Sequence, residues 1–168
     1  MNETTLLRTV QTAADAKWVA KILANPEIAR AIGVRVSKRL GDEKAIALAA
    51  ITNPGAIQLA LVADERIGVV GFSDYDSEHL KANLWFARAP FSGQRRGSMT
   101  QAVIKACESV ENSWELRTIY AWAISSNIAS QNLLARADFQ HFGTEPSGFQ
   151  INGSSYDLLW YNKVLAPR

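Results

Sequence analysis

Apolar positions in the first third of the chain repeat with the spacing of helices. Residues 13–24 place apolar side chains three and four positions apart, which predicts a helix with one buried face. This helix should end at Asn25-Pro26, because the residue before a proline is disfavoured in helical backbone. The sequence Asn53-Pro54-Gly55 then breaks the chain. The other elements predicted before this break are a strand over 6–10 and helices over 27–32 and 43–51.

Beyond the break the pattern changes to that of strands. The runs 57–63 and 67–75 flank the polar residues 64–66, which predicts a hairpin. Residues 118–124 are apolar on both faces, as is typical of a strand covered on both sides of a sheet. The further predicted elements are a strand over 81–87, a helix over 99–111, a helix capped by Ser126 or Asn127 that ends near Ala137, and strands over 139–144 and 148–163 with a turn at Asn152-Gly153.

The composition is that of one globular unit. The chain has 168 residues, of which 48% are hydrophobic and 20% charged, and it contains no repeat or long linker. We therefore expect an α/β (α+β) fold in a single domain over 1–168, with a mixed, mostly antiparallel sheet flanked by helices. A net charge of +2 argues against a nucleic-acid partner. The single Cys107, expected to be a buried thiol, excludes an internal disulfide.

The sequence also carries expectations about compartment and metals. The chain contains no run of about 18 apolar residues, so no membrane span is predicted. Residues 1–4 lack the basic and apolar blocks of a signal peptide. We therefore expect a cytoplasmic protein without a membrane partner. His79 and His141 have no metal-ligand partners at useful spacing, so no metal site is predicted.

The segment Gln94–Met99 offers the chemistry of a phosphate site. It contains two arginines and a glycine, and it opens the helix predicted over 99–111. A helix N-terminus presents free backbone N–H groups and the positive end of a dipole, both of which favour an anion. Short basic loops before helices are also common without any ligand, so this segment alone leaves both interpretations open.

Three motifs together resemble those of the GNAT (Gcn5-related N-acetyltransferase) superfamily. Residues 94–98 are similar to its Gln/Arg-x-x-Gly-x-Gly/Ala loop, with Met99 where a small residue is usual. Residues 127–139 are similar to its Asn-x-x-Ser-x-x-Leu helix, with Ala137 in place of the common glycine. The hairpin at Asn152-Gly153 is similar to that of the ribosomal-protein and aminoglycoside acetyltransferase branch. The resemblance spans roughly residues 4–163.

This resemblance implies a site for acetyl-CoA, the cosubstrate of that family. The strand 81–87 would separate from the strand 118–124, and its main-chain groups would bind the pantetheine arm. The N–H groups that open the helix after the loop would bind the diphosphate. The cofactor-binding residues implied are Trp85, Phe86, Ala87, Gln94, Arg95, Arg96, Gly97, Ser98, Met99, Asn127 and Ser130.

The resemblance also implies candidate catalytic residues. Ser130, one turn after Asn127, would stabilise or protonate the departing thiolate, a task that many relatives give to a tyrosine where this chain has Leu134. Glu78 and His79 lie in a polar segment where family active sites often find the base, and histidine has a suitable pKa. That segment can equally be a solvated turn. The alternatives to Ser130 are water, Tyr156 and Tyr161.

The acceptor site of the resembled fold is formed by the early helices and the final hairpin. In this chain those segments carry four basic residues and two tryptophans, which suit an acidic or phosphate-bearing acceptor or form only a solvated helix face. These residues are Arg30, Arg35, Lys38, Arg39, Trp18 and Trp160.

The function implied is acyl-CoA-dependent N-acetylation. The acetyl group of acetyl-CoA would pass directly to a primary amine, on a protein N-terminus or a small molecule. One alternative is a catalytically silent GNAT-like module that binds CoA or a partner protein. Another is an amine-modifying enzyme that acts on nucleic acid. The sequence leaves open the identity of the acceptor and whether a homodimer forms.

Overall fold

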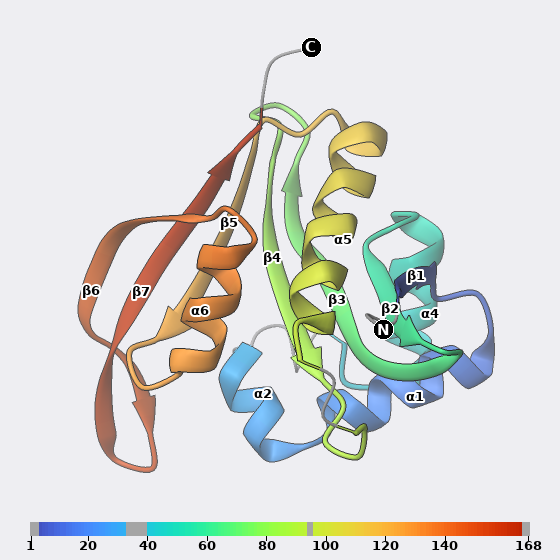
Figure 1. Cartoon of the computed structure of the whole chain (residues 1–168), viewed down its shortest axis with the longest axis horizontal. Helices are drawn as coiled ribbons and strands as arrows, with labels where there is room; N and C mark the ends of the chain where they lie inside the picture. The colour runs from blue at the N-terminus through green and yellow to red at the C-terminus, as the bar shows by residue number, and fades with distance from the viewer. Residues whose placement is uncertain (1–3, 33–39, 94–95, 166–168) are drawn as a thin grey trace.

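The computed structural model describes residues 4–32, 40–93 and 96–165 (Figure 1). The predicted elements are present with small shifts of their ends, except that the strands predicted over 139–144 and 148–163 are divided differently. In chain order they are β1 (Thr5–Thr9), α1 (Ala13–Leu23), α2 (Pro26–Ile32), α4 (Glu43–Thr52), β2 (Ile57–Val62), β3 (Glu65–Asp76), β4 (Lys81–Arg88), α5 (Ser98–Trp114), β5 (Thr118–Ile124), α6 (Ile128–Arg136), β6 (Gln140–Ile151) and β7 (Ser154–Val164).

The strands form one seven-stranded sheet in the order β1-β2-β3-β4-β5-β7-β6. Every pair of neighbours is antiparallel except β4 and β5, which run parallel. The expected mixed, mostly antiparallel sheet flanked by helices is therefore confirmed. No helix in the described residues is long and apolar enough to cross a membrane.

Two buried cores hold the helices against opposite faces of the sheet. In Figure 1, α5 and α6 lie across the near face, where Val103 and Leu134 are fully buried. The other face carries α1 and α4, whose Val19 and Ile46 are fully buried. Because α5 presents its buried side chains at helical spacing, the strong amphipathic pattern of its sequence is explained by this packing.

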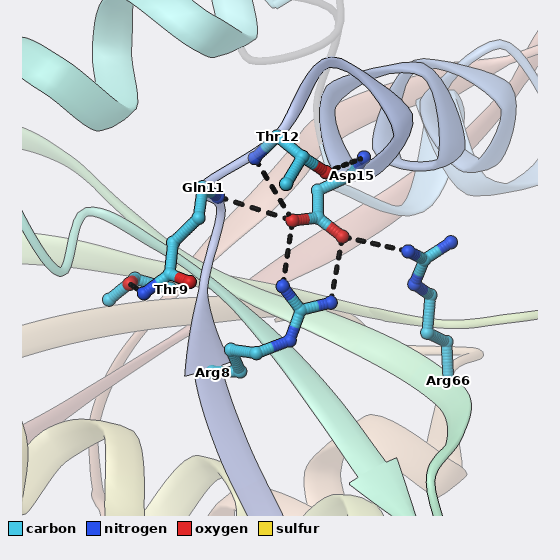
Figure 2. Close-up of polar contacts among 6 residues, drawn as sticks. All are labelled: Arg8, Thr9, Gln11, Thr12, Asp15 and Arg66. Atoms are coloured by element: carbon cyan, nitrogen blue, oxygen red, sulfur yellow. Dashed lines mark hydrogen bonds and ion pairs between the residues drawn. The ribbon is translucent and has the colours of Figure 1, made fainter.

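A buried ion cluster fixes α1 to the sheet (Figure 2). Arg8 of β1 donates two hydrogen bonds to the Asp15 carboxylate, at 2.8 and 2.7 Å, and Arg66 of β3 donates a third at 2.8 Å. Asp15 also accepts from the backbone N–H groups of Gln11 and Thr12, and the Thr12 hydroxyl caps the helix in return. The bonds from Arg8 are the largest cause that holds the pKa of Asp15 far below its usual value, against the effect of burial.

The prediction of two strands separated after residue 144 is wrong. β6 runs without interruption over Gln140–Ile151, and its register against β7 shifts between Glu145 and Phe149. Pro146 and Gly148 are typical of a turn, but here the residues between Glu145 and Phe149 form an irregularity in an edge strand, where a missing N–H donor is tolerated. The predicted turn at Asn152-Gly153 is confirmed, with φ of +50° and +82°.

β5 is covered less completely than its sequence predicts. Ile119, Ala121 and Ala123 are buried under α5 and α6, as expected. Tyr120 and Trp122 point to the other face and are only half-buried. The apolar pattern on that face therefore comes from aromatic side chains that contact one another, rather than from a second helical layer among the described residues.

Candidate active site

The two parallel strands of the sheet diverge along their length. β4 and β5 are paired only through residues 81–83 and 118–120. From Leu84 to Arg88, β4 continues to pair with β3, while its other edge has no strand partner among the described residues. Backbone groups on that edge can therefore accept hydrogen bonds from a ligand or donate to one. The opening between the two strands is the basis of the site.

A cavity of about 300 Å³ occupies this opening, at the small end of the range for small-molecule sites. Its lining is mostly apolar and comes from α2, β4, α5 and α6. The residues that line it are Ile28, Ala31, Ile32, Phe86, Ala87, Arg88, Met99, Asn127, Ala129, Ser130 and Leu133. Residue types of this kind shield a ligand from water while a few polar groups fix its orientation.

α6 places two polar groups on the wall of the cavity. Asn127 is the N-cap of α6, as expected, and its Oδ1 accepts from the backbone N–H of Ser130 at 3.1 Å. This bond satisfies one of the free donors at the start of the helix and fixes the first turn. Ser130 is half-buried and lines this cavity.

α5 begins beside the same cavity. Gly97 is its N-cap, with φ of +81°, a left-handed conformation that glycine adopts without strain. The loop before it is fixed by Arg88, which donates to the backbone carbonyls of Ser92 and Gly93. Ser98 is buried and Arg96 is exposed. Gln94 and Arg95, two residues of the predicted phosphate loop, lie outside the described residues.

Met99 occupies a space that Gly68 leaves open in β3. A Cβ at Gly68 would overlap the sulfur of Met99 and would lie 2.7 Å from the carbonyl oxygen of Ala87. The Met99 side chain therefore lies against the sheet and forms an apolar part of the cavity lining. Its bulk is directed away from the main-chain N–H groups that open α5, so the large residue is compatible with a ligand at the helix N-terminus.

The sequence of residues 5–140 matches the family described as "Acetyltransferase (GNAT) domain". This match covers most of the chain. The protein belongs to the GNAT acetyltransferase family. Members of this family are acyl-CoA-dependent N-acetyltransferases. Comparison with curated proteins gave no significant match.

Solved acetyltransferase structures share this fold over nearly their whole length. The spermidine N-acetyltransferase from Vibrio cholerae, in complex with CoA and spermine, superposes with a TM-score of 0.78 at 19% identity and 95% coverage of both chains. The microcin C7 self-immunity acetyltransferase, in complex with acetyl-CoA and AMP, gives 0.73 at 21% identity, with 98% of this chain and 94% of that chain covered. A ribosomal L7/L12 α-N-protein acetyltransferase with coenzyme A gives 0.75 at 16% identity, with 96% and 94% covered.

Glu78 and His79 do not line the cavity of this GNAT domain. They lie in the turn between β3 and β4, where the His79 Nδ1 is 3.0 Å from the Asp76 carboxylate and the backbone N–H of His79 lowers the pKa of Asp76. The lining of the cavity begins at Phe86, five residues along β4 from Lys81, or about 17 Å at a rise of about 3.3 Å per residue. The structure therefore does not bring these two residues together with Ser130.

A second, smaller space continues the site through the sheet of the GNAT domain. It has a volume of about 40 Å³ and shares Ala31, Ile32, Phe86 and Ser130 with the larger cavity. Trp85 and Leu84 of β4 also line it, together with Trp122 of β5. Among the predicted main-chain group, Phe86 and Ala87 therefore border the large cavity, and Trp85 borders the small one.

Sequence reasoning assigned the early helices to the acceptor site through their basic residues, and it missed the apolar face of α2 that lines the cavity. Ile28, Ala31 and Ile32 have the spacing of one helical face, and that face lines the cavity. A short helix with an apolar stripe normally indicates core, so no signal separated the two uses. Trp122 was missed for a similar reason, because the apolar pattern of β5 is typical of a strand that is buried on both faces.

Two other expectations about the chemistry can be compared with the structure. Cys107 lies on the buried face of α5, as expected, and burial raises the pKa of its thiol to about 12, which leaves it unreactive at neutral pH. Within the described ranges, no three His, Cys, Asp or Glu side chains gather in a way that would hold a metal ion.

Proposed function

We propose that this protein transfers an acetyl group from acetyl-CoA to a primary amine, on a protein N-terminus or a small molecule, by direct transfer. The observation that carries the proposal is the apolar cavity between the diverging strands β4 and β5, with the N-termini of α5 and α6 on its walls. The whole chain, 1–168, acts in this proposal as one GNAT-like acetyltransferase domain. Three solved neighbours contain CoA or acetyl-CoA, which supports the same cosubstrate here.

The residues present fit an acyl-CoA molecule. The edge of β4 that has no strand partner in the described part of the chain offers main-chain groups at Trp85, Phe86 and Ala87 to the amide-rich pantetheine arm. The main-chain N–H groups from Gly97 to Met99 and the cationic side chain of Arg96 suit the diphosphate, with Gln94 and Arg95 as further proposed contacts. Asn127 and Ser130 would bind the end of the arm beside the reacting thioester.

The transfer needs one bond to form and one to break. The nitrogen of the neutral amine bonds to the acetyl carbonyl carbon, the carbon–sulfur bond breaks, and the sulfur leaves with the electron pair and takes a proton. The excess proton of the amine passes to water. Binding both reactants in one cavity supplies the proximity that this bimolecular step requires.

Ser130 is the residue we assign to the leaving sulfur. Ser130 lines both the large and the small cavity, and the Asn127 cap fixes the turn that carries it. A hydroxyl donor at that point stabilises the charge that develops on sulfur. Leu134, where relatives have a tyrosine, is fully buried in the core and takes no part. Glu78 and His79, at the far end of β4, would act on an amine only through a relay that the cavity does not include.

The deciding experiment measures free thiol released from acetyl-CoA by the purified protein with a panel of amines. Release that depends on both protein and amine is the expected result. Tight binding of acetyl-CoA without release across a broad panel would instead support a silent binding module. Ser130→Ala should lower kcat more than it raises KM for acetyl-CoA, because the assigned bond strengthens as the sulfur becomes charged. Ser126→Ala, an exposed serine on the loop before α6, is the matched control.

A further inference from the structure

One face of the sheet next to the cavity is aromatic. By strand alternation, the side chains of Tyr120 and Trp122 on β5 and of Trp160 on β7 point away from α5 and α6. Trp122 and Trp160 are direct cross-strand partners. α2 packs against β4 and α4 against β2, so the helices described on this side lie over the other half of the sheet.

Two pairs of rings on this face are in contact. Trp122 contacts Phe149 of β6, with ring centroids 5.4 Å apart, and Tyr120 contacts Phe142 of β6 at 5.9 Å. Phe142 is 54% exposed and the others are half-buried. We name these five side chains, Tyr120, Trp122, Phe142, Phe149 and Trp160, the aromatic face.

A carboxylate belongs to the same surface. Glu145 of β6 accepts a hydrogen bond from the indole N–H of Trp160 at 3.3 Å. Its side chain lies in a space left by Gly148, where a Cβ would come within 2.8 Å of the Glu145 carboxyl carbon. Among the described residues of β5, β6 and β7 that alternate onto this face, Glu145 is the one that carries a charge.

The aromatic face is continuous with the reaction site. Trp122 lines the small cavity, which shares Ser130 and three other lining residues with the larger one. Adjacent strands are about 4.8 Å apart, so a group that lies over Trp160 and Glu145 is about 5–10 Å from the cavity at Trp122. The far end of a molecule with its reacting amine in the small cavity can therefore reach these rings.

We propose that the aromatic face binds a second positive charge of the acetyl acceptor, so that the substrate class is an amine with another cationic group about 5–10 Å away. This inference rests on the proposed function. Indole and phenol rings attract an ammonium or guanidinium group through the negative face of the π system, and the Glu145 carboxylate adds an opposite charge. An anionic group at the same place would meet the carboxylate and the ring faces, both of which repel it.

This assignment differs from the acidic or phosphate-bearing acceptor that the basic residues of the early segments suggested. Trp18 of α1 packs against Arg66 and Phe91, whereas Trp160 of β7 donates a hydrogen bond to Glu145 of β6. These two tryptophans therefore belong to separate surfaces. Arg35, Lys38 and Arg39 lie outside the described residues, and Arg30 is exposed on α2.

The test compares three acceptors of similar length that differ in the far group: 1,5-diaminopentane, 5-amino-1-pentanol and 6-aminohexanoate. We expect kcat/KM for thiol release to be at least about tenfold higher for the diamine than for the amino alcohol, and lowest for the amino acid. Trp160→Leu and Glu145→Gln should each reduce the preference for the diamine, whereas Trp160→Phe should keep most of it. Glu108→Gln, on the exposed side of α5, is the control for Glu145→Gln and should leave the preference unchanged.

A binding measurement separates the proposed acetyl transfer from the proposed cation site. Tryptophan fluorescence reports the binding of the same three compounds to the CoA-loaded protein. If the diamine binds more tightly than the other two compounds, in a way that depends on Trp160, but no thiol is released, the proposed transfer is wrong and the cation site is supported. Equal rates for all three acceptors, or a preference for 6-aminohexanoate, would overturn the cation assignment and leave the transfer standing. A preference that survives all of the aromatic-face substitutions would overturn it as well.

Discussion

At the scale of single residues, Asp15 shows how a buried charge can be accommodated. Its side chain is 1% exposed, whereas those of Arg8 and Arg66 are 35% and 29% exposed. The carboxylate therefore lies out of water and depends on its partners, while both arginines keep part of their hydration. The local signal, Thr12 followed three residues later by Asp15, predicts a helix cap but says nothing of Arg66, which is 51 residues away.

Removal of this charge should be costly. We expect Asp15→Asn to lower the free energy of unfolding by about 2–4 kcal/mol, less than for a fully buried pair because the arginines are partly solvated. Urea denaturation at pH 7 measures the change. Asp64→Asn, at an exposed turn with φ of +63°, is the matched control and should change stability by less than about 0.5 kcal/mol. A similar loss in both variants would argue against the ion cluster.

The same residue predicts a pH dependence. Because the pKa of Asp15 is lowered in the folded state, its stabilising effect is complete above the unfolded value of about 3.9 and is lost as pH falls toward the folded value. Between pH 5 and pH 3 the stability gap between the wild type and Asp15→Asn should therefore narrow by about 1 kcal/mol. Urea titrations at both pH values test this, and a gap that widens on acidification would contradict it.

Gly68 is a second residue whose neighbours determine what it must be. Gly68→Ala places a Cβ against the Met99 sulfur and the Ala87 carbonyl oxygen, so β4 or α5 has to move. We expect a loss of about 1–3 kcal/mol and weaker acetyl-CoA binding, because both displaced residues line the cavity. Gly143→Ala, with nothing within 4 Å of the new Cβ, is the control. Equal stability and affinity in the two variants would count against this packing.

At the scale of elements, each wall of the active site is a short segment with an ordinary local signal. Asn127 caps a helix, Gly97 begins one, and β4 is a strand of alternating pattern. These signals made the elements predictable from the sequence. No local signal predicted that β4 diverges from β5 after residue 83; only the family resemblance implied it. The divergence depends on how α5 and α6 pack against two strands of similar composition.

The start of α5 gives the prediction that belongs to this scale. Gly97→Asp adds a negative charge beside the N–H groups assigned to the diphosphate, and should raise the dissociation constant of acetyl-CoA at least about tenfold. Isothermal titration calorimetry measures it. Gly93→Asp adds the same charge four residues earlier in the exposed loop and should have a smaller effect. An unchanged constant in Gly97→Asp would remove the loop from the proposed site.

At the scale of the whole molecule, the proposed cosubstrate joins both halves of the sheet. The cavity takes residues from α2 near the N-terminus and from α6 after β5, so a bound molecule contacts segments about 100 residues apart. A ligand that binds only the folded chain stabilises it by mass action.

Acetyl-CoA should therefore raise the melting temperature. At 100 times the dissociation constant the gain is about 2.7 kcal/mol, which for a chain of this size corresponds to roughly 5–10 °C. Differential scanning calorimetry with and without the ligand measures the shift. Gly97→Asp at the same ligand concentration should show a clearly smaller shift, and the absence of any shift in the wild type would contradict binding in the cavity.

The sequence by itself determined the elements, the mixed sheet and the family, because helix periodicity, strand alternation, caps and the Asn152-Gly153 turn are local properties. Only the tertiary structure decided which side chains meet. It brought Ser130 to the opening between β4 and β5, left Glu78 and His79 at the far end of β4, and exposed the aromatic side of β5. These outcomes depend on contacts between residues far apart in the chain, and no local pattern encodes them.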